Sequence, residues 1–450
     1  MIPRLHLRKL VIVLVFCAAP ARAQAPIEEN EETIEGLDSL ADAIVWMTSR
    51  RWEGRRTPPP PVVSRPVGGY RVDSLSHPLS VHADPETSIE HAETVLSELE
   101  HVADWLLVEG WDAPLADGGL GGTAGFDLYL LPCDALADAH ADPSARWSFL
   151  DAVSSFAVVD PALTGSELQA AVAHAYTQAL LLNLDPAEAR PWRRATGAWM
   201  AWRATGDFGG AVRWQQEQPW RSWIAKAADE GSGGALLLAL LSERHGHEFV
   251  RELWQFTRQR TWDGIDLRAS PDMWQVLDRA VEMAGDKLHS MIEDFAVARW
   301  FLDARREHSE FRALDGIDGT IVPEFEVALA DLPEHTPAGA PLEPFGSAYA
   351  LVDVRGAPAA SRLRVWLRGE YGVEWALTAS RLDASGRELA RLSAPPRRGD
   401  RRSYLPVELT ADTTHVMVSI TNLSHRLPDA DDEDDPNARA YRLIFDVVTD

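Results

Sequence analysis

Cysteine is nearly absent from this chain: its 450 residues include only Cys17 and Cys133. Cys17 lies in an N-terminal segment that we expect to be removed, so the mature monomer keeps one cysteine and cannot form an internal disulfide. Its stability must therefore come from packing. With 46% hydrophobic and 25% charged residues, the composition is that of a globular protein able to bury a core, and the length predicts two or three domains.

Long hydrophobic runs are also missing. The longest, LVIVLVFCAA at residues 10–19, is about half of the roughly 20 residues that a spanning helix needs, so we expect no membrane span. Basic residues precede this run and Ala21-Arg22-Ala23 follows it, which is typical of a secretory signal peptide over residues 1–23. We therefore expect export to the periplasm, the cell surface or the extracellular space.

Positive charge is scarce. Lys and Arg number 43 against 69 Asp and Glu, which gives a formal charge of −26; removing residues 1–23 takes away four basic and no acidic residues and leaves −30. Such a surface repels nucleic acid and anionic membranes, so we exclude both as partners. A protein or glycan partner stays open, and so does the oligomeric state.

Nucleotide and serine-hydrolase motifs are absent too. The glycine-rich loop ADGGLGGTAG, residues 116–125, lacks the spacing of a phosphate-binding loop, and the strand-like FDLYLLP follows it where a helix should open. No G-x-S-x-G motif occurs in the sequence.

Three regions are present after the signal peptide. Residues 24–69 contain a short amphipathic segment and the proline-rich linker TPPPPVVSRPVGG, which we interpret as an arm packed on the body rather than a detachable pro-segment. Residues 70–320 predict a small sheet followed by helices, the first capped by Asp84 and the last a long one over 271–302. Residues 321–450 alternate apolar and polar positions in seven short segments, which predicts an antiparallel β-sandwich and an α+β chain overall.

The segment AVAHAYTQALL, residues 171–181, raises the question of chemistry. On a helix, residues four apart share one face, so an H-E-x-x-H helix offers two imidazoles to Zn²⁺ and a glutamate as general base. This segment has only His174, with Gln178 one turn later. On composition alone, a lone histidine among alanines and leucines is more often a core residue than a ligand.

The order of several short motifs changes that interpretation. FDLYLL, SSFAVVDP, VAHAYTQALL, WRRATGAWMAW, GGALLLALLSERHG and FVRELW follow one another and precede the strand-rich region. This order resembles a family of secreted bacterial proteins regarded as zinc metallopeptidases of the gluzincin type, in which the helix reads V-A-H-E-x-x-H-A and the next helix supplies a glutamate ligand within E-x-x-A-x-W. The resemblance covers most of the chain from about residue 70. It implies a zincin-like domain, a small sheet plus a helical subdomain, followed by an all-β sandwich.

Aligned with that pattern, His174 keeps the first ligand, Ala175 occupies the general-base position, Gln178 replaces the second histidine, and Arg194 stands at the third ligand. An alanine cannot deprotonate water, a neutral amide is a poor zinc ligand, and a guanidinium opposes a divalent cation. The resemblance therefore implies an exported, catalytically inactive metallopeptidase homologue that acts as a binding or structural protein, with neither zinc nor another cofactor expected.

Two other functions stay open. An active zinc peptidase with a rearranged site would take ligands from His140, His245 or His247, although Gly246 between the last two explains them as a helix end. A surface carbohydrate- or protein-binding module would instead act through the sandwich of residues 321–450.

Three further features have ordinary explanations that we favour. Glu188 could approach the former metal site but sits in a loop typical of solvated surface. The acidic segment 429–437 could hold Ca²⁺ but lacks the rest of a calcium loop, which favours a solvated hairpin tip. The 17 tryptophans could line a sugar-binding groove, but their helical spacing favours core packing. The clustered ones are Trp192, Trp199, Trp202, Trp214, Trp220 and Trp223.

Overall fold

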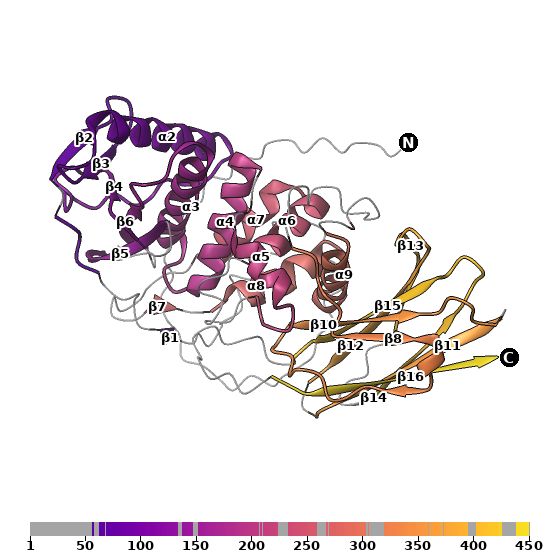
Figure 1. Cartoon of the computed structure of the whole chain (residues 1–450). Helices are drawn as coiled ribbons and strands as arrows, with labels where there is room; N and C mark the ends of the chain where they lie inside the picture. Colours follow the sequence, from indigo (N-terminus) through magenta and orange to yellow (C-terminus); the bar gives the residue numbers. More distant parts are fainter. Residues whose placement is uncertain are drawn as a thin grey trace, which may run out of the picture.

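The chain is a mixed α+β protein with several sheets, shown in the computed structural model of Figure 1. The structure describes residues 56–57, 63–67, 69–133, 137–146, 152–206, 208, 210–223, 233–258, 267–268, 270–302, 305, 319–358, 360–371, 373–394, 402–424 and 438–449. The expected signal peptide, the amphipathic segment before the linker and the acidic segment 429–437 lie outside the described residues.

The N-terminal sheet has the strand order β2-β3-β4-β6-β5. Its strands are β2 (Tyr70–Asp73), β3 (Leu79–Ala83), β4 (Phe126–Leu130), β6 (Val153–Val159) and β5 (Ala137–Arg146). The three central strands run parallel, and both edge strands run antiparallel to their neighbours. Because side chains alternate along a strand, Leu79, Leu128 and Ala157 face the apolar core, while the next residues face the opposite side.

Helices cover the apolar face of this sheet and continue beyond it (Figure 1). They are α2 (Ile89–Val108), α3 (Gly165–Leu184), α4 (Arg190–Thr205), α5 (Gly210–Glu217), α6 (Gly234–His245), α7 (His247–Thr257), α8 (Met273–Met283) and α9 (Leu288–Trp300). The expected Asp84 cap is wrong: Ser88 is the N-cap of α2 and accepts the His91 N–H. The single long helix expected over 271–302 is also wrong, because Gly285, at φ 86°, separates α8 from α9.

Two more sheets follow, with orders β13-β12-β15-β10-β8 and β14-β11-β16-β9. Their strands are β8 (Phe325–Ala328), β9 (Glu334–His335), β10 (Ser347–Asp353), β11 (Ser361–Gly369), β12 (Trp375–Leu382), β13 (Glu388–Ser393), β14 (Arg402–Glu408), β15 (His415–Asn422) and β16 (Tyr441–Thr449). Leu363, Leu377, Val418 and Phe445, from both sheets, share one apolar core, so the sheets pack face to face. We call residues 325–449 the two-sheet body. All seven predicted strands are present, while β8 and β9 were not predicted.

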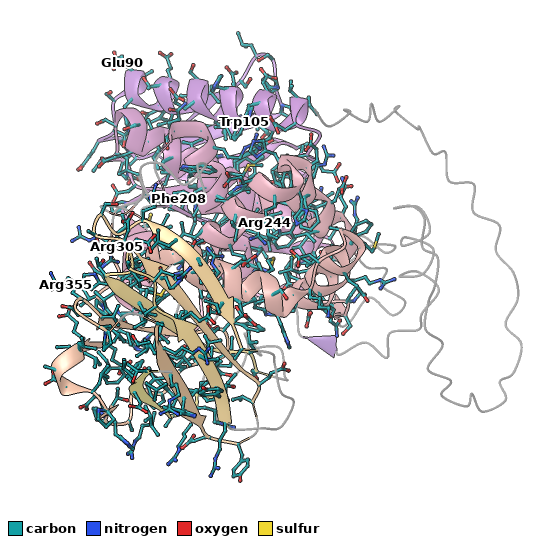
Figure 2. All side chains as sticks on the ribbon, turned by 90° about the vertical axis from the view of Figure 1, so that its right-hand side faces the viewer. Glu90, Trp105, Phe208, Arg244, Arg305 and Arg355 are labelled. Carbon is teal, nitrogen blue, oxygen red and sulfur yellow. The ribbon has the colours of Figure 1, made fainter. Side chains whose placement is uncertain are left out.

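The helices and the two-sheet body are packed together. Trp300 and Phe301 at the end of α9 share an apolar cluster with Tyr349 of β10, whose hydroxyl donates to the Ala296 carbonyl at 2.7 Å. Arg305 lies over the Trp300 ring at 3.7 Å, and Figure 2 shows it at this junction. Core packing is confirmed for three of the six clustered tryptophans, since Trp192, Trp199 and Trp223 are fully buried, whereas Trp202 and Trp214 are partly buried and Trp220 is exposed.

No helix in the described part of the chain is both long and apolar enough to span a bilayer. A further two-stranded pair joins β1 (Arg56–Thr57) to β7 (Leu267–Arg268).

Candidate functional site

His174 lies in the middle of α3, where α4 packs closely against it. Gly197 of α4 makes this approach possible: a Cβ there would stand 2.9 Å from the His174 carbonyl oxygen and 3.0 Å from Nδ1. His174 is half-buried, and its imidazole lies against α4 at Gly197. Burial lowers the pKa of His174 to about 4; nearby Asp138 opposes that change and Arg194 adds to it. The imidazole is therefore neutral at pH 7.

Asp138 on the edge strand β5 is the acidic partner at this site. It accepts a hydrogen bond from Arg190, lies 3.6 Å from Nη2 of Arg194, and also accepts the Ala139 N–H at 3.0 Å. Burial would raise the pKa of Asp138, but Arg190 and Arg194 outweigh it and hold the pKa below its usual value. The carboxylate is thus ionised and already compensated by two guanidinium groups.

The positions assigned from the resemblance now have known environments. Ala175 is fully buried and brings only a methyl group. Gln178 is buried as well, and its Nε2 has no hydrogen-bond partner in the part of the chain that the structure describes. Arg194 pairs with Asp138 rather than standing apart. A Zn²⁺ ion does not fit this set, because one neutral imidazole would have to hold it beside a cation and an amide.

The other histidines divide into two groups. His140, two residues after Asp138 on β5, is influenced by the same Asp138 and Arg194 as His174, and burial lowers its pKa. His245 instead packs on the Phe249 ring, and His247 on the Trp199 ring. The prediction that Gly246 caps a helix end between them is confirmed, since it is the C-cap of α6.

Glu188 does not lie on solvated surface, so our expectation for it is wrong. It is buried, and its carboxylate accepts the Ala189 N–H at 2.9 Å and the Met273 N–H at 2.6 Å, at the beginnings of α4 and α8. Helix N-termini favour an acceptor at this position. Burial and the neighbouring Asp185 nevertheless raise the pKa of Glu188 well above its usual value. Glu188 therefore joins two helices.

A second polar cluster, which the sequence did not predict, lies on the sheet face opposite the helices. Arg65 inserts into it from the proline-rich linker and binds Asp142 through two hydrogen bonds, 2.7 Å from Nε and 2.6 Å from Nη2. The same guanidinium lies 2.8 Å from Asp117 and also binds Asp127. Nε2 of His82 lies 2.8 Å from Asp127. We call these five residues the Arg65 cluster.

The glycine-rich loop contributes to the Arg65 cluster. Its Gly119 and Gly121 N–H groups donate to Asp117 at 2.7 and 3.1 Å. The loop therefore holds a carboxylate of this chain. Little in the sequence indicated the cluster, because its three carboxylates come from the glycine-rich loop, from β4 and from β5.

Neither the models of known protein families nor the curated proteins include a match to this chain.

Proposed function

We propose that this chain is an exported relative of gluzincin metallopeptidases that has lost catalysis and acts by binding or as a structural component. The contact that carries the proposal is the one between Arg194 and Asp138, at 3.6 Å, beside His174. A guanidinium occupies the position where the resemblance requires a third zinc ligand. In this arrangement a positive charge of the protein itself compensates the carboxylate.

The fold is compatible with this descent. The helix carrying His174 packs on a mixed sheet whose edge strand β5 runs antiparallel to its neighbour, and the following helix α4 brings Arg194 back to that edge. We interpret residues 70–320 as zincin-like and the two-sheet body as a β-sandwich. The chemistry favours inactivity, because water activation needs a metal or a base and Ala175 supplies neither.

The first experiment compares the mature protein with a rebuilt variant, A175E/Q178H/R194E. We expect the mature protein to show no chelator-sensitive cleavage of casein or a peptide library. The rebuilt variant should take up one zinc per chain, and His174→Ala in the same background should abolish that uptake. If the rebuilt variant folds, as judged by circular dichroism, and binds no zinc, our placement of these positions is wrong.

A rearranged zinc peptidase is the competing enzyme hypothesis, and His140 is the residue that favours it, because it shares Asp138 and Arg194 with His174. It predicts zinc-dependent cleavage that both His140→Ala and His174→Ala abolish. Such a result would overturn the proposal of inactivity.

A binding module in the two-sheet body is a second candidate function, and two neighbouring rings, one exposed and one half-buried, favour it. Trp366 and Tyr404 lie opposite each other on neighbouring strands, with ring centroids 5.3 Å apart, and Tyr404 is 45% exposed. A partly exposed aromatic pair on a sheet is a common element of a binding surface.

A further inference from the structure

The outward side of the four-stranded sheet has an unusual composition. Inward residues of its strands form the buried core, so alternate residues point away from it. We call the outward residues of the three longer strands the outer face; they are Arg362, Arg364, Trp366 and Arg368 of β11, Arg402, Tyr404, Pro406 and Glu408 of β14, and Arg442, Ile444, Asp446 and Val448 of β16. Figure 1 shows this sheet on the side of the two-sheet body away from the helices.

Three arginines form one row directly across these strands. Arg368 is paired in register with Arg402 on one side and with Arg442 on the other, and all three are exposed. Adjacent strands lie about 4.8 Å apart, and like charges directly opposite each other destabilise a sheet. Among the described residues, Arg368 and Arg442 have no ion pair or hydrogen bond. The two facing arginines Arg368 and Arg442 are therefore unfavourable for the isolated fold and favour binding of an anion.

A second row, of three rings and one isoleucine, lies next to the arginine row. Trp366 is paired in register with Tyr404 on one side and with Ile444 on the other, and Ile444 is paired with His335 of β9. The guanidinium of Arg364 lies 5.2 Å from the centre of the Trp366 ring while it pairs with Asp446 at 2.5 Å, which holds the indole in place. The apolar C–H face of a sugar packs well on such rings.

The outer face is positive although the chain is strongly negative. It carries five arginines against two carboxylates, in a protein whose formal charge is −26. Both carboxylates lie at the end away from the arginine row, where Glu408 is 3.8 Å from Arg362 and Asp446 binds Arg364. We therefore expect the negative groups of a ligand to bind at the end of the outer face where the arginine row lies.

We propose that the outer face binds an anionic polysaccharide, with carboxylate or sulfate groups on Arg368 and Arg442 and sugar rings on Trp366 and Tyr404. A glycan combines negative groups with ring faces at a moderate charge density, whereas the chain's overall charge opposes the dense charge of nucleic acid. The outer face has no large aliphatic side chain that is fully exposed, as insertion into a bilayer would require.

This surface is separate from His174, so the inference does not depend on the proposed loss of catalysis. Zinc-dependent cleavage would overturn the proposed function and leave this binding surface standing. Absence of glycan binding would overturn this inference alone.

The test measures binding of the full mature chain to polygalacturonate and to chondroitin sulfate by isothermal titration calorimetry at low salt, with neutral dextran as the uncharged probe. The variant R368Q/R442Q removes two charges of the row, and Tyr404→Ala removes one exposed ring. The matched control is R355Q/R387Q, which removes two exposed arginines elsewhere on the same body, each paired with a nearby aspartate.

We expect binding to at least one acidic glycan and none to dextran. Kd should rise about tenfold or more in R368Q/R442Q, rise also in Tyr404→Ala, and stay within about twofold in the control, with all binding weakened by added salt. The proposal is wrong if R368Q/R442Q binds as tightly as the wild type, if the control loses as much affinity, or if neither glycan binds. Binding to duplex DNA or to phosphatidylglycerol vesicles, but to neither glycan, would also overturn it.

Discussion

Arg65→Met should destabilise the fold strongly, because Arg65 is the cation shared by three buried aspartates. The Arg65 side chain is 10% exposed, while those of Asp117, Asp127 and Asp142 are 0% exposed. Methionine keeps most of the volume but removes the charge and all three contacts. Among the described residues, the carboxylates would then keep weaker partners: His82 at 2.8 Å from Asp127, the Gly119 and Gly121 N–H groups on Asp117, and the Ser154 hydroxyl on Asp142. Breaking a buried ion pair in this way costs about 3–5 kcal/mol, so we expect a loss of that size in the free energy of unfolding.

The assay is urea denaturation followed by circular dichroism at pH 7. Arg71→Met is the matched control, because Arg71 pairs with Asp73 at 2.7 Å where both side chains are far more exposed. Arg71→Met should lower the free energy of unfolding by only about 0–1 kcal/mol. Arg65→Lys keeps the charge but cannot make the bidentate hydrogen bond to Asp142, so its stability should lie between those of the wild type and Arg65→Met. An Arg65→Met variant within about 1 kcal/mol of the wild type would refute the idea that this guanidinium holds the linker on the sheet.

Three further predictions concern α3, α4 and α9. The pKa of His174 is about 4 in the fold, against 6.5 for an unperturbed histidine. The neutral imidazole therefore contributes stability that is fully present above pH 6.5 and is lost as pH falls toward 4, by about 3 kcal/mol. His174→Gln should lose this dependence in denaturation measured from pH 7 to pH 4. Gly197→Ala should lower the free energy of unfolding by about 1–3 kcal/mol and lower Tm, because the added Cβ would stand 2.9 Å from the His174 carbonyl oxygen. An unchanged Tm would show that α3 and α4 can move apart without loss of stability. Burial raises the pKa of Glu293 to about 7, so stability should fall as pH rises from about 4.5 to 7, and Glu293→Gln should remove that fall; a parallel pH profile in both proteins would contradict it.

The strands were predictable where one face is buried and the other is solvated. β11 and β14 alternate strictly, so their pattern indicated a half-buried sheet. β5 was missed because its sequence, ADAHADPSAR, alternates alanine with polar residues and contains a proline. Its aspartates Asp138 and Asp142 are buried and paired with arginines from other segments, which no local pattern indicates.

The candidate site was only partly predictable. The resemblance placed His174 and Arg194 on neighbouring helices, and the structure has them there. It gave no indication of Asp138, because that carboxylate comes from a strand more than fifty residues before Arg194 and meets it only through tertiary packing. For the same reason Arg65 looked like part of a linker, although its charge is bound by carboxylates from two strands and a loop.

The central claim is that the His174 site can no longer hold a metal. Its most direct measurement is the zinc content of the mature protein after incubation with excess zinc and removal of loosely bound ion. We predict far less than one zinc per chain, unchanged in His174→Ala. Stoichiometric zinc that disappears in His174→Ala would contradict the account.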